Sequence, residues 1–104
     1  AIVGDAMLDV YLRGDVERIS PEAPVPVVRV WERKDALGGA ANVAQNVAAL
    51  GARCALVAAV GADVAGTRLR DRLAEIGADP DALVAVERPT TTKTRVIARA
   101  QQVV

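Results

Sequence analysis

Histidine and phenylalanine are absent from this sequence, and cysteine, tryptophan and tyrosine occur once each. Structural zinc sites are built from several Cys and His ligands, so a chain with only Cys54 excludes one. Cys54 opens an apolar run, where a lone thiol is usually core filler rather than a nucleophile. Because Trp31 and Tyr11 are the only aromatic residues, a hydrophobic core must be built from Ala, Val, Leu and Ile.

Long apolar runs and an excess of one charge are missing too. No stretch approaches the ~18 apolar residues that a membrane-spanning helix needs, and no signal-peptide pattern is seen. Thirteen basic residues balance thirteen acidic ones, which argues against nucleic acid or an acidic membrane as the main partner. We therefore expect a soluble protein of the reducing cytoplasm.

The chain has 104 residues, of which 52% are hydrophobic, enough for one small domain with a packed core. Hydrophobic periodicity and turn residues predict strands at 1–4, 9–13, 25–33, 53–60 and 83–86 and from 92 onward, and helices at 40–50 and 64–76. Strands that alternate with helices predict an α/β fold with a mainly parallel sheet flanked by helices. Both ends of the chain have the pattern of strands, so we expect a fragment of a larger fold.

Helix boundaries and core faces follow from the same pattern. Asp63 is predicted to cap the second helix, and Gly51 and Gly77 to end the two helices. The apolar residues at helical spacing, which predict the core faces, are Val43, Val47 and Leu50 in the first helix and Ala65, Leu69, Leu73 and Ile76 in the second.

Three prolines, Pro21, Pro24 and Pro26, exclude a helix between the second and third strands and favour an extended edge or a turn. Along the third strand Val27 and Trp31 face one side, and Val28 and Val30 face the other. A small sheet that is apolar on both faces is expected to lie over a site or to pair with another subunit.

Polar residues at two places suit a hydroxyl-rich or anionic ligand. Gly38 and Gly39 precede the first helix, and Asn42 lies in its first turn, where backbone N–H groups are unpaired. Asp5 and Asp9 are expected just past the carboxyl end of the first strand, where ligands of open α/β sheets bind. The alternative is a tight turn made by the glycines and ordinary turn roles for both aspartates.

The last strand offers a third candidate. Lys93, Arg95, Arg99 and Gln101 share one face, which can hold a phosphate through charge-assisted hydrogen bonds. The alternative is a solvated strand face.

Three segments in this order resemble the ribokinase-like (PfkB) carbohydrate kinases over essentially the whole chain: GDAMLD (4–9), GGAANVA (38–44) and GADVAG (61–66). Two others, RISPEAPVPVV (18–28) and TKTRVIARAQQ (92–102), closely resemble bacterial D-glycero-D-manno-heptose-7-phosphate kinases. Those kinases phosphorylate O1 of a heptose 7-phosphate on the route to the ADP-heptose of lipopolysaccharide core.

The resemblance implies roles for the polar residues. Asp9, the di-glycine Gly38–Gly39 and Asn42 would contact sugar hydroxyls. Lys93 and Arg99, and more weakly Arg95 and Gln101, would hold the substrate's own phosphate. A flap of about residues 10–37 would close over the sugar and pair with a second subunit's flap, giving a homodimer.

The family's catalytic aspartate, in a Gly-Ala-Gly-Asp-like motif, and its ATP-binding loops have no counterpart in this sequence. We therefore expect residues 1–104 to be the N-terminal, substrate-binding portion, with no catalytic residue, no metal ligand and no activity alone. ATP and Mg²⁺ would serve the full-length enzyme. The alternatives are a kinase of another sugar or a nucleoside, and a non-catalytic module that binds sugar phosphate or dimerises.

Overall fold

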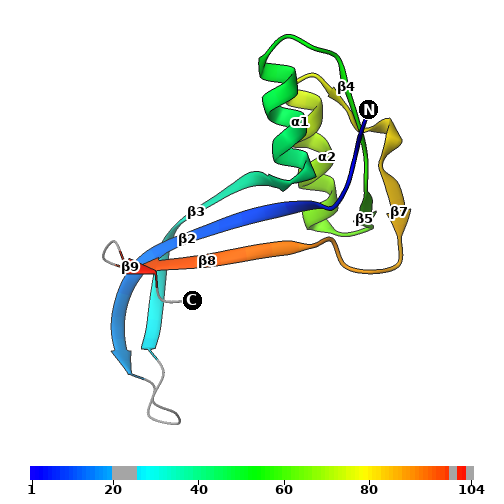
Figure 1. Ribbon diagram of the computed structural model, residues 1–104. Helices are drawn as coiled ribbons and strands as arrows, with labels where there is room; N and C mark the ends of the chain where they lie inside the picture. The colour runs from blue at the N-terminus through cyan, green and yellow to red at the C-terminus, as the bar shows by residue number, and fades with distance from the viewer. Residues whose placement is uncertain (20–25, 99–100, 103–104) are drawn as a thin grey trace. The chain divides into compact units, whose positions relative to one another are not determined.

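The computed structural model describes residues 1–19, 26–98 and 101–102 (Figure 1). Arg99 and the prolines Pro21 and Pro24 lie outside the described residues. The elements in chain order are β1 (Ile2–Val3), β2 (Ala6–Ile19), β3 (Pro26–Gly39), α1 (Ala40–Ala49), β4 (Cys54–Val57), β5 (Ala59–Gly61), α2 (Val64–Glu75), β6 (Ala78–Asp79), a 3-10 turn (Pro80–Ala82), β7 (Val84–Val86), β8 (Thr92–Ala98) and β9 (Gln101–Gln102).

Two compact units make up the chain. The first comprises Ala1–Asp9 and Ala36–Lys93, and the second comprises the described residues within Val10–Asp35 and Thr94–Val104. The long strands β2, β3 and β8 therefore each contribute residues to both units.

The first unit is a layer of parallel strands covered by helices. β4 pairs in parallel with β1 and with β6, giving the order β1-β4-β6, and β5 pairs in parallel with β7. The two helices contact each other and pack on these strands, α1 on β1 and β4 and α2 on β5 and β6 (Figure 1). This arrangement confirms the predicted α/β fold with a mainly parallel sheet.

Small side chains form the contact between α1 and the strands. Ala41 and Ala44 are fully buried, whereas Val43 and Leu50, both predicted to face the core, are 48% and 87% exposed. The prediction was wrong because it ranked residues by size, while a helix that lies close to a sheet buries its alanines. Val47 is half-buried against the core.

The second helix follows its prediction more closely. Leu69 and Leu73 are fully buried, Ile76 packs against the core, and Asp63 caps the helix by accepting a hydrogen bond from Gly66 N. Gly51 and Gly77 follow the two helices with φ of 89° and 80°, the left-handed conformation that glycine adopts readily.

Several strand boundaries differ from the prediction. The run expected as one strand over 53–60 is two, β4 and β5, separated at Ala58, because they pair with different neighbours. β6 and the 3-10 turn after it were not predicted, since elements of two or three residues leave no periodic signal.

The second unit is built from the distal parts of β2 and β3, which were predicted shorter than they are, and from β8 and β9. β9 pairs antiparallel with β8, with Ala98 opposite Gln101. Gly14 of β2 is buried, and a Cβ there would collide with the carbonyl of Arg29 on β3. Arg13 and Glu32 form an ion pair at 3.3 Å, and the side chain of Trp31 is 62% exposed.

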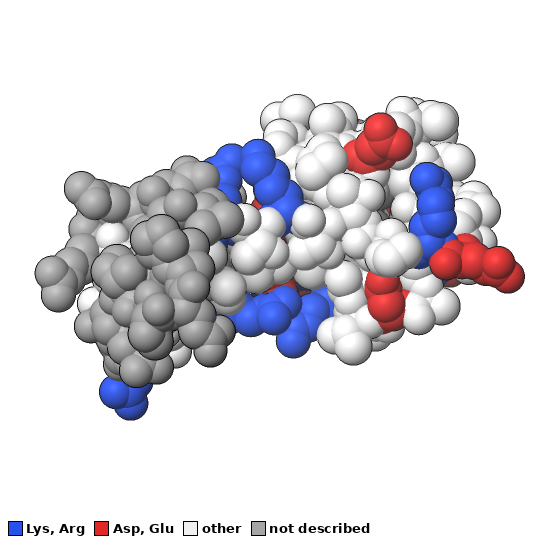
Figure 2. Space-filling view, turned by 90° about the horizontal axis from the view of Figure 1, so that it is seen from below, with Lys and Arg blue, Asp and Glu red and all other residues white. Residues whose placement is uncertain are grey.

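Charge is mixed rather than segregated on the surface in view. Figure 2 shows both basic and acidic residues among uncharged atoms, and at the right of the view a basic side chain lies directly beside acidic ones. No helix in the described part of the chain is long and apolar enough to cross a bilayer.

Candidate functional site

Asp9 and Gly38 are in direct contact at the centre of the candidate site. Gly38 is buried, and a Cβ built on it would lie 2.9 Å from both Cγ and Oδ1 of Asp9 and 2.8 Å from Cγ of Met7. Asp9 lies inside β2, three residues after its start, and not just past β1 as predicted, because β2 begins at Ala6. Gly38 therefore leaves the space that the Asp9 carboxylate occupies.

One oxygen of the Asp9 carboxylate lacks a hydrogen-bond donor in the described part of the chain. Its Oδ1 is buried, and no described residue donates a hydrogen bond to it. A buried polar atom without a partner costs about 1–3 kcal/mol. Asp9 as a whole is only half-buried, so part of the residue is open to a ligand that brings hydroxyl donors.

The second glycine sets the start of α1. Gly39 has φ of 58°, and a Cβ on it would collide with the carbonyl oxygen of Asp5. That oxygen accepts a hydrogen bond from Ala40 N at 2.7 Å, which ties the first helical residue to the chain ahead of β2. Asn42 follows in the first turn of α1 with its side chain exposed, so its amide is available to a ligand.

Lys93 belongs to the same unit and lies on β8, the strand next to β2. The sheet order is β3-β2-β8-β9, so β2, which carries Asp9, lies between the strand of Gly38 and the strand of Lys93. Leu8 N donates to Thr91 O at 3.0 Å, which places the start of β8 beside the residue that precedes Asp9. Lys93 itself is exposed.

The other predicted phosphate ligands belong to the second unit. The guanidinium of Arg95 lies over the ring of Tyr11, 5.8 Å from its centroid. Gln101 is in β9, and Arg99 lies outside the described residues.

A hollow of about 470 Å³ borders the first unit where β1 and β7 end. Asp5, Met7, Arg88 and Thr91 are among its lining residues. Arg88 and Thr91 were not singled out from the sequence, because they fall in a loop with no recognisable motif. Carboxyl ends of parallel strands are where α/β folds bind ligands, but Asp9, Gly38 and Lys93 are not among the residues that line this hollow.

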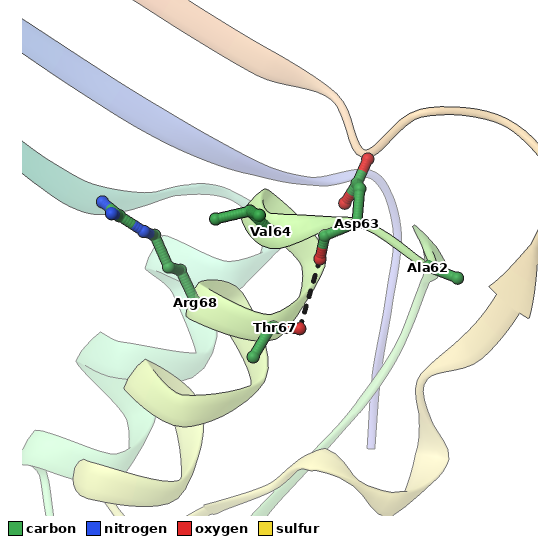
Figure 3. Close-up of a pocket in the computed structure, with 5 residues that line it drawn as sticks. All are labelled: Ala62, Asp63, Val64, Thr67 and Arg68. Carbon is green, nitrogen blue, oxygen red and sulfur yellow. Dashed lines mark hydrogen bonds between the residues drawn. The ribbon is translucent and has the colours of Figure 1, made fainter.

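A second hollow, of about 700 Å³, lies beside the start of α2 (Figure 3) and is lined by Ala62, Asp63, Val64, Thr67 and Arg68. None of the predicted site residues lines it. Thr67 Oγ1 donates to the carbonyl of Asp63 at 3.2 Å, an ordinary bond of a first helical turn. The Asp63 side chain points away from Arg68, toward the segment that joins β7 to β8 (Figure 3).

Asp63 and Thr90 form a dense hydrogen-bonded cluster there. Asp63 Oδ1 accepts from Gly66 N at 2.7 Å and from Thr90 Oγ1 at 2.6 Å, and Oδ2 accepts from Thr90 N at 2.8 Å. The Thr90 bonds are the largest cause that lowers the pKa of Asp63 below its ordinary value, because they favour the charged form. An ionised acceptor fixed in this way holds structure and is unsuited to act as a base, as the sequence indicated.

Metal-ligand geometry is not found in the described residues: no three His, Cys, Asp or Glu side chains converge there.

The family model for pfkB family carbohydrate kinases matches residues 1–104. The chain belongs to this family. Among curated PfkB relatives, a D-beta-D-heptose 7-phosphate kinase of Bordetella bronchiseptica is 59% identical over 97% of the chain and 32% of its own length. A bifunctional protein HldE of Alcanivorax borkumensis is 55% identical over 97% of the chain and 21% of its own length.

Solved structures agree on the fold. Ribokinase of Arabidopsis thaliana, solved with ribose and ATP, superposes with a TM-score of 0.77 at 22% identity, over 96% of this chain and 32% of that one. The chain thus spans about a third or less of the length of each of these three proteins.

Proposed function

We propose that this chain is the sugar-phosphate-binding part of a PfkB kinase that transfers a phosphoryl group from ATP to O1 of a heptose 7-phosphate. The observation that carries the proposal is the Asp9 carboxylate, packed on Gly38 with Oδ1 buried and without a donor among the described residues. A sugar is a ligand made of such donors. The heptose 7-phosphate kinase that is 59% identical supports the choice of sugar.

In this proposal four residues form the hydroxyl-binding site. Asp9 accepts hydrogen bonds from the sugar, Gly38 makes room for the Asp9 carboxylate, and Gly39, which is exposed, lets the ring approach the backbone closely. Asn42, exposed in the first turn of α1, donates and accepts through its amide.

The phosphate at position 7 needs a fixed cation. Lys93 is our first choice, since β8 lies next to the strand of Asp9 and Lys93 is exposed. Arg99 is the second choice by resemblance alone. Arg95, already stacked on Tyr11, and Gln101 are weaker candidates.

Chemistry at O1 needs groups that we assign outside this chain. ATP with Mg²⁺ supplies the phosphoryl group, and the Arabidopsis ribokinase is a relative solved with ATP. We expect the catalytic base and the nucleotide site in the part of the full-length protein that lies beyond the matched third, and no turnover from the isolated chain. The reaction would take place in the cytoplasm, where ATP is supplied.

The flap is proposed to close over the sugar and to pair with a second copy. Val30 and Trp31, in the second unit, are 46% and 62% exposed. They present apolar surface that the apolar surface of a second copy can cover. A homodimer that buries this surface would explain why Val30 and Trp31 are exposed in the single chain.

The decisive experiment is a substrate comparison with the full-length protein that contains this chain. Heptose 7-phosphate, the same heptose without phosphate, and ribose are each assayed with ATP, and the product is located by phosphorus NMR. We expect turnover of the first with the new phosphate on O1, and Lys93→Ala to reduce kcat/KM about ten- to hundredfold for heptose 7-phosphate only.

Other outcomes assign a different function. Preference for ribose or a nucleoside would make the protein another kind of PfkB kinase. Equal losses for both heptoses in Lys93→Ala would remove Lys93 from the phosphate site. Binding of heptose 7-phosphate without turnover by the full-length protein would favour a non-catalytic module.

A further inference from the structure

Asp63 makes more hydrogen bonds than a helix cap requires. A cap needs one bond, from a backbone N–H of the first turn to the side-chain oxygen, and Gly66 N provides it at 2.7 Å. The two bonds from Thr90, 27 residues away in sequence, add nothing to the cap. The carboxylate therefore has a second task, which is to hold Thr90.

Thr90 is held at two points and from two sides. Its N–H and its hydroxyl both donate to the Asp63 carboxylate, one to each oxygen, so both the backbone and the side chain of Thr90 are bonded to Asp63. Its Oγ1 also accepts from Gly61 N at 2.9 Å, and Thr90 is only 6% exposed.

Close packing surrounds the cluster. A Cβ on Gly61 would collide with the carbonyl of Arg88, and a Cβ on Gly66 would collide with the carbonyl of Gly61. Gly61 thus lets the end of β5 approach the segment before β8 at backbone distance, and Gly66 lets the first turn of α2 approach the end of β5.

The path from Thr90 to the candidate site is short. Thr91 O, the next carbonyl, accepts the hydrogen bond from Leu8 N at 3.0 Å, and Leu8 precedes Asp9. Thr92 Oγ1 donates back to Thr90 O at 3.2 Å, and Lys93 follows. These hydrogen bonds connect the Thr90 segment to the residue before Asp9 and to the residue before Lys93.

We propose that Asp63 is a positioning residue, which acts through Thr90 to hold the Thr91–Lys93 segment in the register that a sugar phosphate requires. The proposal rests on the proposed function, because it takes Lys93 and Asp9 as groups that bind this substrate. It assigns Asp63 no contact with substrate. Its distinguishing feature is that loss of the Thr90 bonds changes substrate binding even when α2 stays capped.

Asp63→Ser separates the two tasks. Serine still caps a helix through one oxygen, but it cannot accept from Gly66 and from both groups of Thr90. Thr90→Val removes the hydroxyl while keeping the shape, and Thr90→Ser is the matched control that keeps the hydroxyl. The variants are made in the full-length protein, and melting temperature and helix content are recorded for each.

For Asp63→Ser and Thr90→Val we expect kcat/KM for the phosphorylated sugar to fall about ten- to hundredfold, since a displacement of about 1 Å has such effects. The loss should lie in KM for the sugar, with KM for ATP unchanged and Thr90→Ser near wild type. Hydrogen exchange of the Leu8 amide should be faster in both variants, while that of amides inside α1 stays unchanged.

Two results would overturn the proposal. Sugar-phosphate kinetics within about twofold of wild type in variants that melt earlier would show that the cluster only stabilises the fold. An unchanged hydrogen-exchange rate of the Leu8 amide in Asp63→Ser would also overturn the proposal, whatever the substrate is. Failure of wild type to accept heptose 7-phosphate would instead count against the proposed function, and the Leu8 measurement would still decide on Asp63.

Discussion

Replacing Gly38 by alanine tests the packing on which the proposed site depends. The added Cβ would lie 2.8 Å from Met7 Cγ and 2.9 Å from Asp9 Cγ and Oδ1, whereas carbon atoms in contact normally stay about 3.5–4.0 Å apart. The φ of Gly38 is not in the left-handed region, so the substitution acts through this collision and not through backbone strain.

The expected magnitude follows from the overlap. Overpacking by one methyl group in a filled site costs about 1–3 kcal/mol of folding stability. Relief requires Asp9 to move by several tenths of an ångström or more. We expect the sugar kcat/KM of the full-length protein to fall about ten- to hundredfold, with KM for ATP unchanged, measured by steady-state kinetics with each substrate varied in turn.

Gly51→Ala is the matched control. Gly51 has φ of 89° and no atom within 4 Å of the position of a Cβ, so alanine there costs about 1–2 kcal/mol of backbone strain without a collision. The two variants should lose similar stability, but only Gly38→Ala should lose affinity for the sugar. Wild-type sugar kinetics in Gly38→Ala, or equal kinetic losses in both variants, would refute the reasoning.

Two further outcomes are expected of the full-length protein. Asn42→Ala should raise KM for the sugar about tenfold, as loss of a hydrogen-bonding group in a polar site does, with KM for ATP unchanged; unaltered sugar kinetics would remove Asn42 from the site. Trp31→Lys should shift the sedimentation of a dimer toward that of a monomer, because a charge in an apolar interface is costly; an unchanged mass would place the dimer contact elsewhere.

The sequence predicted the fold wherever a segment carried a strong period or a capping residue. The second helix was placed almost to the residue, because Asp63 caps it, Gly77 follows it and Leu69 and Leu73 are its largest apolar side chains. The first helix was placed equally well, but its buried face was not, because alanine at Ala41 and Ala44 carries no hydrophobic signal that distinguishes it from an exposed alanine.

The sequence indicated a set of candidate site residues but not their geometry. The motifs indicated Asp9, Gly38 and Asn42. Only the structure shows that the Asp9 carboxylate packs against Gly38 and occupies the space that a side chain there would need. The hydrogen bonds between Thr90 and Asp63 could not be predicted from the sequence, because the two residues are 27 positions apart. Long-range hydrogen bonds of this kind have no local pattern.

The placement of the two aromatic residues decides what optical spectroscopy can observe in this protein. Tyr11 and Trp31 both fall in the second unit, and the 67 residues of the first unit, Ala1–Asp9 and Ala36–Lys93, include no aromatic side chain. Intrinsic fluorescence of this chain therefore reports on the flap alone. Melting of the alanine-lined helical layer would pass unseen by that probe, and far-ultraviolet circular dichroism would be needed to detect it.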